Sequence, residues 1–156
     1  MIRVVFIGTG EIGVPSLRWL LSSPHVQVVA SVTQPDKPAG RNLALRSSPI
    51  KDLSLLHHLP VLQPLKLRSP DSIASLSDLH PDLIVVMAYG QILPQEILSL
   101  PTLACLNLHA SLLPRWRGAA PIQASILAND PTSGITVMYM AEGLDTGDIL
   151  SQLSLP

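Results

Sequence analysis

The fold and the chemistry of this chain are organised around residues 104–123, which read Ala-Cys-Leu-Asn-Leu-His-Ala-Ser-Leu-Leu-Pro-Arg-Trp-Arg-Gly-Ala-Ala-Pro-Ile-Gln. The first six residues alternate as a β-strand does, so Leu106 and Leu108 share one face while Asn107 and His109 share the other. Polar side chains are costly to bury inside a sheet unless they are paired. They are tolerated near the carboxyl end of a strand, where the crevice of an open α/β sheet admits ligands. We therefore predict that Asn107 and His109 face such a crevice.

The strands around this stretch are strongly apolar. Residues 2–7, 26–33 and 83–88 contain few polar side chains, a pattern typical of parallel strands that are covered on both faces. Helical patterns separate the strands, and the sequence predicts further strands and helices at 61–63, 134–140 and 149–156, and at 15–21, 49–58, 69–79, 94–98 and 118–127. This alternation predicts an α/β fold: a Rossmann-like open, mostly parallel twisted sheet with helices on both faces.

Length and composition limit the class of protein. The 156 residues are enough for one domain, and the net charge of −1 argues against a protein that holds nucleic acid by bulk charge. Any contact with nucleic acid must then come from a local patch. The only cysteine, Cys105, can make no internal disulfide, which favours a reducing, cytoplasmic location. No apolar run approaches about 18 residues, so we expect no membrane span and no membrane partner.

A glycine-rich turn follows the first strand. Gly8, Gly10 and Gly13 match the G-x-G-x-x-G pattern of dinucleotide-binding folds, between a strand and a helix that opens at Pro15. The acidic residue expected at the end of the next strand is missing, because Asp36 lies in the loop beyond it. The pattern therefore favours a tight strand-to-helix turn, while a dehydrogenase-type nucleotide-binding module remains an alternative.

Residues 34–48 are predicted to form a long polar loop. Loops of this length after a buried strand are often functional. Lys37, Arg41 and Arg46 make it the most basic segment apart from Arg115 and Arg117, which flank Trp116 as a possible anion-binding rim. The alternative is a solvated loop with scattered charges.

The chemistry depends on Asp145, which lies between Gly143 and Gly147 on a turn where glycines allow a close approach. Ser111 is a candidate nucleophile, but no nucleophile-elbow glycine pattern surrounds it. A metal site would need ligands at a fixed spacing, and the candidates show none. Those candidates are His109, Glu142, Asp145 and Asp148.

Direct transfer of an acyl group between two bound substrates is the chemistry that remains. Asn107 and His109 would donate hydrogen bonds to a developing oxyanion. Asp145 would orient His109, stabilise its charged form and relay the proton that an attacking amine loses. The alternative is that Asn107 and His109 are satisfied core polar groups and that Asp145 is an ordinary turn residue.

Several segments of the chain, taken in order, resemble the methionyl-tRNA formyltransferase family. They are residues 6–9, 14–17, 33–41, 88–90, 92–94, 107–123 and 143–148. The resemblance implies that residues 1–156 are a formyltransferase catalytic domain. Its activity would be transfer of a formyl group from 10-formyltetrahydrofolate to the amino group of initiator methionyl-tRNA, for translation initiation and without a metal.

The resemblance also assigns site residues. By position they are Asn107, His109 and Asp145 for catalysis, Ser111, Leu112, Leu113 and Pro114 for folate, and Arg41 beside the tRNA acceptor end. The chain departs from the family pattern at three places: the first turn (Gly10, Ile12 and Gly13), the residues after Arg41, which lack lysines, and Ala110, which stands where glycine is usual.

The resemblance further implies that the catalytic domain is incomplete at its C-terminal end and that a C-terminal β-barrel tRNA-binding domain is absent. An apolar surface exposed in this way would favour self-association. Formyltransferases that act on glycinamide ribonucleotide or an amino sugar share the chemistry and remain alternatives. An inactive fragment that keeps only the fold is another.

Overall fold

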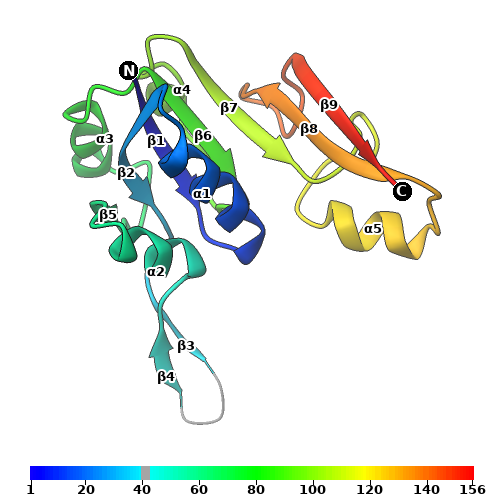
Figure 1. Cartoon of the computed structure of the whole chain (residues 1–156), viewed down its shortest axis with the longest axis horizontal. Coiled ribbons are helices and arrows are strands. Elements are labelled where there is room, and N and C mark those ends of the chain that lie inside the picture. Colours follow the sequence, from blue (N-terminus) through cyan, green and yellow to red (C-terminus); the bar gives the residue numbers. More distant parts are fainter. Residues whose placement is uncertain (40–42) are drawn as a thin grey trace.

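The computed structural model describes residues 1–39 and 43–156. Within them, seven strands form one sheet in the order β5-β2-β1-β6-β7-β8-β9 (Figure 1). In this order, the neighbouring strands β5, β2, β1, β6 and β7 run parallel to one another. Strand β8 is antiparallel to β7, and β9 is antiparallel to β8. The strands of this sheet are β1 Ile2–Gly8, β2 Val26–Val32, β5 Val61–Leu62, β6 Leu83–Met87, β7 Ala104–His109, β8 Ser133–Tyr139 and β9 Ile149–Leu155.

Helices cover both faces of the parallel part, as the sequence predicts. The helices are η1 Glu11–Gly13, α1 Val14–Ser22, α2 Pro49–Leu56, α3 Pro70–Ser77, α4 Gln95–Leu98 and α5 Pro121–Leu127. On one face, Phe6 of β1 packs with Leu17 of α1 and Ile50 of α2. On the other, Ile7 of β1 packs in a cluster that also contains residues of α3 and α4. Because successive residues of a strand point to opposite faces, β1 contributes to both cores.

Two helices begin with the serine caps that their sequences indicate. The Ser48 side chain accepts a hydrogen bond from the Lys51 amide at the start of α2, and the Ser69 side chain accepts one from the Ser72 amide at the start of α3. Each cap satisfies one of the amide groups that a helix leaves free in its first turn.

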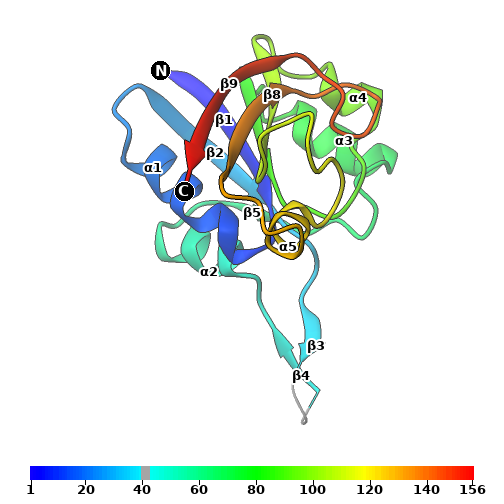
Figure 2. The same cartoon turned by 90° about the vertical axis from the view of Figure 1, so that its right-hand side faces the viewer.

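Two parts of the predicted loop at 34–48 form short strands. They pair as an antiparallel ribbon of β3 (Lys37–Ala39) and β4 (Ala44–Arg46), which projects from the body of the protein (Figures 1 and 2). Lysine, alanine and proline are depleted in strands, so local propensity does not indicate this ribbon. The predicted tRNA contact Arg41 lies outside the described residues.

Packing accounts for two glycines of the G-x-G-x-x-G turn. A Cβ added to Gly8 would lie 2.7 Å from the Met87 carbonyl oxygen, and one added to Gly13 would lie 3.3 Å from Ile50 Cδ1. Gly8 therefore lets β1 and the end of β6 approach closely, and Gly13 lets η1 approach α2. These contacts agree with a tight strand-to-helix turn. Within the described residues, no helix combines the length and the apolar character needed to cross a membrane.

Candidate active site

Strand β7 carries two of the predicted catalytic residues at its carboxyl end. Asn107 pairs with Val86 of β6 on one side and with Met138 of β8 on the other, and His109 pairs with Thr136 of β8. Leu108 packs against the core on the α1 and α2 face. Because Asn107 and His109 alternate with Leu108, they lie on the opposite face of the sheet.

The structure brings Asp145 to these two residues from the segment between β8 and β9. Its Oδ2 atom lies 3.6 Å from His109 Nδ1, and its Oδ1 atom accepts a hydrogen bond of 3.4 Å from Asn107 Nδ2. Only 7% of the His109 side chain and 11% of the Asp145 side chain are exposed. The three residues that the sequence places at the site therefore form one largely buried cluster.

Two backbone groups, which no sequence pattern identifies, complete this cluster. The Gly118 amide donates a hydrogen bond of 2.8 Å to Asp145 Oδ2, and the Trp116 carbonyl oxygen lies 2.8 Å from His109 Nε2. Gly118 has φ +98°, a conformation that glycine adopts without a steric penalty. The glycine in the Arg-Gly-Ala-Ala-Pro run was the available signal for such a turn, but it does not indicate which atom its amide meets.

The surroundings of His109 define what the ring can do. Its Nε2 faces a carbonyl oxygen and its Nδ1 faces a carboxylate, and both of these groups are acceptors. A neutral imidazole can donate to only one of them, whereas the charged form can donate to both. The arrangement therefore suits a histidine that takes up positive charge during a reaction, next to the amide donor of Asn107.

The segment after β7 is held by its own hydrogen bonds. Ser111 is fully buried, and its hydroxyl donates to the Arg115 carbonyl at 2.6 Å, so its proton is directed to the main chain. Thr136 donates to the Ser111 carbonyl at 2.7 Å and accepts from the Leu113 amide at 3.1 Å. Gln152 of β9 donates to the Leu113 carbonyl at 2.9 Å. These contacts give Ser111 a structural role in the turn, in place of a nucleophilic one.

The four residues predicted to contact folate therefore differ in how far their side chains are exposed to a ligand. Ser111 and Leu113 are buried, Leu112 is half-buried and Pro114 is exposed. A ligand at this segment would meet the side chains of Leu112 and Pro114 or the main chain. The predicted folate contact remains a prediction, with Ser111 and Leu113 shaping the segment from within.

Arg115 and Trp116, in the segment after β7, are both held by Asp130. This carboxylate accepts hydrogen bonds from Arg115 at 2.9 and 2.6 Å and from Trp116 Nε1 at 2.6 Å. The Arg115 guanidinium also lies 4.4 Å from the centroid of the Trp116 ring. The hydrogen bonds from Arg115 and Trp116 hold the pKa of Asp130 below its usual value. Arg115, considered as part of an anion-binding rim, is thus paired with a carboxylate, although its side chain is exposed; Arg117 is exposed as well.

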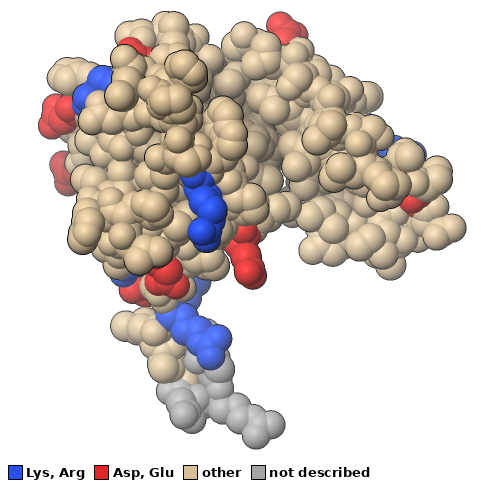
Figure 3. All heavy atoms as spheres, viewed as in Figure 1, with Lys and Arg blue, Asp and Glu red and all other residues tan. Residues whose placement is uncertain are grey.

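The two arms of the β3–β4 ribbon carry exposed positive charge. Lys37 and Arg46 pair in its register and are both exposed, and Figure 3 shows basic side chains on the ribbon. Among residues 1–39 and 43–156, no group of three or more His, Cys, Asp and Glu side chains is arranged to hold a metal ion.

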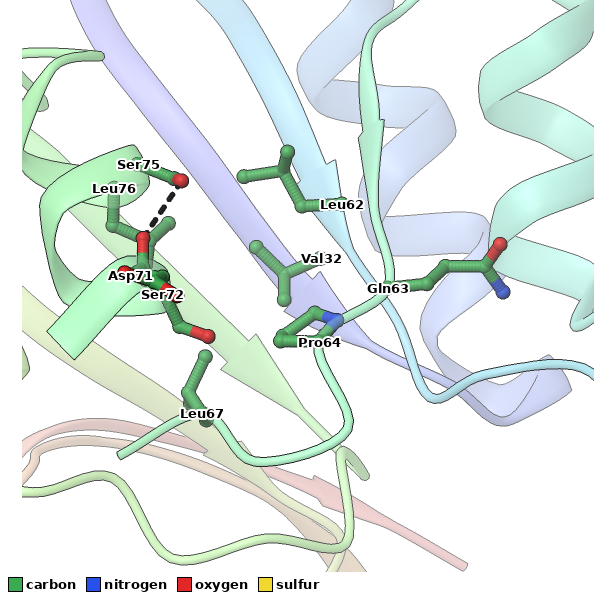
Figure 4. Close-up of a pocket in the computed structure, with 9 residues that line it drawn as sticks. All are labelled: Val32, Leu62, Gln63, Pro64, Leu67, Asp71, Ser72, Ser75 and Leu76. Atoms are coloured by element: carbon green, nitrogen blue, oxygen red, sulfur yellow. Dashed lines mark hydrogen bonds between the residues drawn. The ribbon is translucent and has the colours of Figure 1, made fainter. Parts of the chain in front are cut away.

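A cavity of about 220 Å³ lies elsewhere, at the carboxyl ends of β2 and β5 beside α3 (Figure 4). In the sheet order, β1 and β6 separate β2 from β7. The Ser75 hydroxyl donates to the Asp71 carbonyl, and the Ser72 hydroxyl donates to the Lys66 carbonyl, so these polar groups at the cavity are already engaged. The cavity is not part of the cluster around His109.

The chain was also compared with known proteins. The pattern of the formyl transferase family matches residues 2–156. The chain is 56% identical over 155 residues to the methionyl-tRNA formyltransferase of Pseudomonas syringae pv. tomato, and 54% identical over 149 residues to that of Magnetococcus marinus. These matches cover 99% and 96% of this chain but 49% and 47% of the two relatives. The chain thus spans about half the length of the curated relatives it matches.

A solved structure shares the fold. The phosphoribosylglycinamide formyltransferase of Bacillus halodurans superposes with a TM-score of 0.79 at 24% identity, covering 98% of this chain and 79% of that one. The family match over residues 2–156 and the 56% identity to a relative over 99% of this chain lead to one assignment. The chain belongs to the formyl transferase family.

Proposed function

We propose that the protein transfers a formyl group from 10-formyltetrahydrofolate to the amino group of methionyl-tRNA. The observation that carries this proposal is that Asp145 lies 3.4 Å from the Asn107 side chain and 3.6 Å from the His109 ring, beside the carboxyl end of β7. The acceptor is proposed from the 56% identity to methionyl-tRNA formyltransferases.

In the proposed reaction, the amino nitrogen forms a bond to the formyl carbon, and the bond between that carbon and the donor nitrogen breaks. Asn107 Nδ2 and the His109 ring donate hydrogen bonds to the formyl oxygen as negative charge develops there. Asp145 accepts the proton that the amine loses, and this proton passes to the nitrogen that leaves. Each oxyanion donor raises the rate by a factor of about 10²–10³, and general acid–base catalysis raises it by a factor of about 10²–10⁴.

The free protein must rearrange slightly for this role. His109 Nε2 is engaged by the Trp116 carbonyl, and Asn107 Nδ2 is engaged by Asp145. A substrate oxygen would replace one of these acceptors. The segment 111–117 that carries Trp116 is the part we expect to adjust, and Leu112 and Pro114 are the side chains there with surface to offer a folate.

Charge on the ribbon supports a nucleic-acid acceptor. The chain has a net charge of −1, so attraction to phosphates must be local. Lys37 and Arg46 provide such a patch, and Arg41 belongs to the segment that joins the two ribbon strands.

A formylation assay with three acceptors tests the proposal. Methionyl-tRNA, glycinamide ribonucleotide and an amino sugar nucleotide would each be incubated with the protein and 10-formyltetrahydrofolate, and formyl transfer would be measured. We expect transfer to methionyl-tRNA above the other two. Preferential transfer to another acceptor would refute the assigned substrate, and no transfer to any of them would refute the activity.

Self-association is a further expectation that the exposed apolar residues support. All seven residues of β9, the last strand in the sheet order, are exposed, including Leu150 and Leu153. Ile126 and Leu127 of α5 are 71% and 87% exposed. Exposed apolar surface favours association. We expect light scattering to show a mass that rises with concentration, and a smaller rise for Leu153→Lys. A monomer at all concentrations would contradict this expectation.

A further inference from the structure

A second group of polar side chains lies at the base of the β3–β4 ribbon, away from the catalytic cluster. The ribbon stands out from the body of the protein in both views (Figures 1 and 2). Leu45 of β4 and Leu43, just before β4, are 71% and 72% exposed, so the ribbon has few core contacts to fix its direction. An isolated two-stranded ribbon is marginally stable in water. The direction of this ribbon therefore depends on how its base is attached.

Asp36 is the residue immediately before β3, and both of its carboxylate oxygens are engaged. Lys51 of α2 donates to Oδ2 at 2.7 Å, and Gln63, which follows β5, donates to Oδ1 at 2.8 Å. Gln63 also donates to the Gln34 carbonyl at 3.0 Å. The two hydrogen bonds hold the pKa of Asp36 below its usual value, so the carboxylate is charged at neutral pH. One side chain thus ties the incoming arm of the ribbon to two separate elements.

The outgoing arm is attached to the same helix. Ser48 follows β4 and caps α2 by accepting from the Lys51 amide. Its hydroxyl also lies 2.6 Å from that of Thr33, just after β2, and both residues are buried. Thr33 and Ser48 therefore join the two ends of the segment that contains the ribbon. Asp36 acts beyond this junction, at the point where the incoming arm leaves the body.

We propose that Asp36 is a positioning residue that sets the direction of the ribbon, through Lys51 and Gln63, so that Lys37 and Arg46 meet the phosphates of the tRNA substrate. This inference rests on the proposed function. Asp36 itself has the wrong charge to bind a phosphate, and it lies next to Lys37, so its effect on tRNA must come through geometry. Its removal should weaken the use of tRNA without changing the chemistry at His109.

The test is steady-state formylation of methionyl-tRNA by Asp36→Asn. We expect the KM for methionyl-tRNA to rise about tenfold, with kcat and the KM for the formyl donor unchanged, because the ribbon is misdirected while the catalytic cluster is intact. The slope of log KM for methionyl-tRNA against log salt concentration should also become shallower, by about 1, the change expected when one phosphate contact is lost. Glu96→Gln, an exposed carboxylate on α4, is the matched control and should leave all constants unchanged.

A charge exchange separates positioning from a general loss of stability. In the double variant Asp36→Lys with Lys51→Asp, the ion pair is re-formed in reverse, and the Gln63 amide can turn its oxygen toward the new lysine at the cost of its bond to the Gln34 carbonyl. We expect most of the tRNA affinity to return relative to Asp36→Lys alone. If Asp36→Asn fails to fold, as judged by circular dichroism, Gln63→Leu should show a smaller rise in the same KM.

The outcomes distinguish this inference from the function on which it rests. A wild-type protein that formylates no methionyl-tRNA would overturn the proposed function, and the inference with it. A wild-type protein that is active, with Asp36→Asn unchanged or slowed only in kcat, would overturn the inference alone. A charge exchange that recovers nothing would also overturn it.

Discussion

At the scale of one residue, the His109 ring lies between two hydrogen-bond acceptors. The Trp116 carbonyl and the Asp145 carboxylate lie on its two nitrogens, at 2.8 and 3.6 Å. With 7% of its side chain exposed, the ring has little water to replace these partners. The hydrogen bond on Nε2 and the carboxylate near Nδ1 together orient the ring in the free protein.

Substitution of His109 tests this role directly. We expect His109→Ala to lower the single-turnover rate of formyl transfer by about 10²–10⁴, because an oxyanion donor and an acid–base group are lost together. The rate would be measured by rapid quench, and circular dichroism would check the fold. His25→Ala changes an exposed histidine and should retain the wild-type rate. A His109→Ala protein with near wild-type turnover would show that the ring has no part in the chemistry.

The segment from Ser111 to Gly118 is the element that carries the site, and strands β8 and β9 support it. Thr136 of β8 bonds to the Ser111 carbonyl and the Leu113 amide, and it also accepts from Gln152 of β9 at 2.8 Å. The antiparallel strands thus position main-chain atoms of a segment that itself supplies the Trp116 carbonyl and the Gly118 amide. Strands β8 and β9 thereby support the cluster of Asn107, His109 and Asp145 through this segment.

A change at Thr136 tests this support. Thr136→Val keeps the shape of the side chain but leaves buried groups of Ser111 and Leu113 without their partner. We expect a loss of about 1–3 kcal/mol in the free energy of unfolding, measured by urea denaturation. Thr132→Val, at an exposed position, should change stability little. Equal unfolding midpoints for the two variants would mean that the Thr136 hydroxyl does not hold the segment.

The Asp130 contacts give this element a pH dependence. The folded-state pKa of Asp130 is depressed by Arg115 and Trp116, so the stabilisation is present above the unfolded-state pKa and is lost as pH falls through the folded value. We expect the melting temperature of Asp130→Asn to lie below that of the wild type at neutral pH. The difference should shrink in acid, below the usual aspartate pKa of 3.8. A constant difference from neutral pH to strong acid would refute this linkage.

At the scale of the whole molecule, the sequence predicts the layers of the fold, and it indicates that Asn107, His109 and Asp145 lie together. The alternation of Leu106, Asn107, Leu108 and His109 was enough to assign faces, and glycines around Asp145 indicated a close approach. Side-chain periodicity shows which residues share a face, but it does not record strand direction. The antiparallel arrangement of β8 and β9 was therefore not specified.

Other features could not be predicted for related physical reasons. The Trp116 carbonyl and the Gly118 amide are main-chain groups, which every residue possesses, so no residue type marks their role. The Arg115–Asp130 pair joins residues on either side of α5, and Asp36, Lys51 and Gln63 come from three separate parts of the chain. Such contacts depend on how elements pack, which local sequence patterns do not specify.

In the proposed function, Asp145 works with His109 and Asn107 to move a formyl group. The most direct measurement is the single-turnover rate of formyl transfer to methionyl-tRNA by Asp145→Asn, which keeps the shape of the side chain and removes its charge. We predict a fall of about 10²–10⁴ in that rate, since both proton transfer and the charged partner of His109 are lost, with the fold retained by circular dichroism. A rate within about twofold of the wild type would contradict the claim, because a group that carries acid–base catalysis cannot lose its charge at so small a cost.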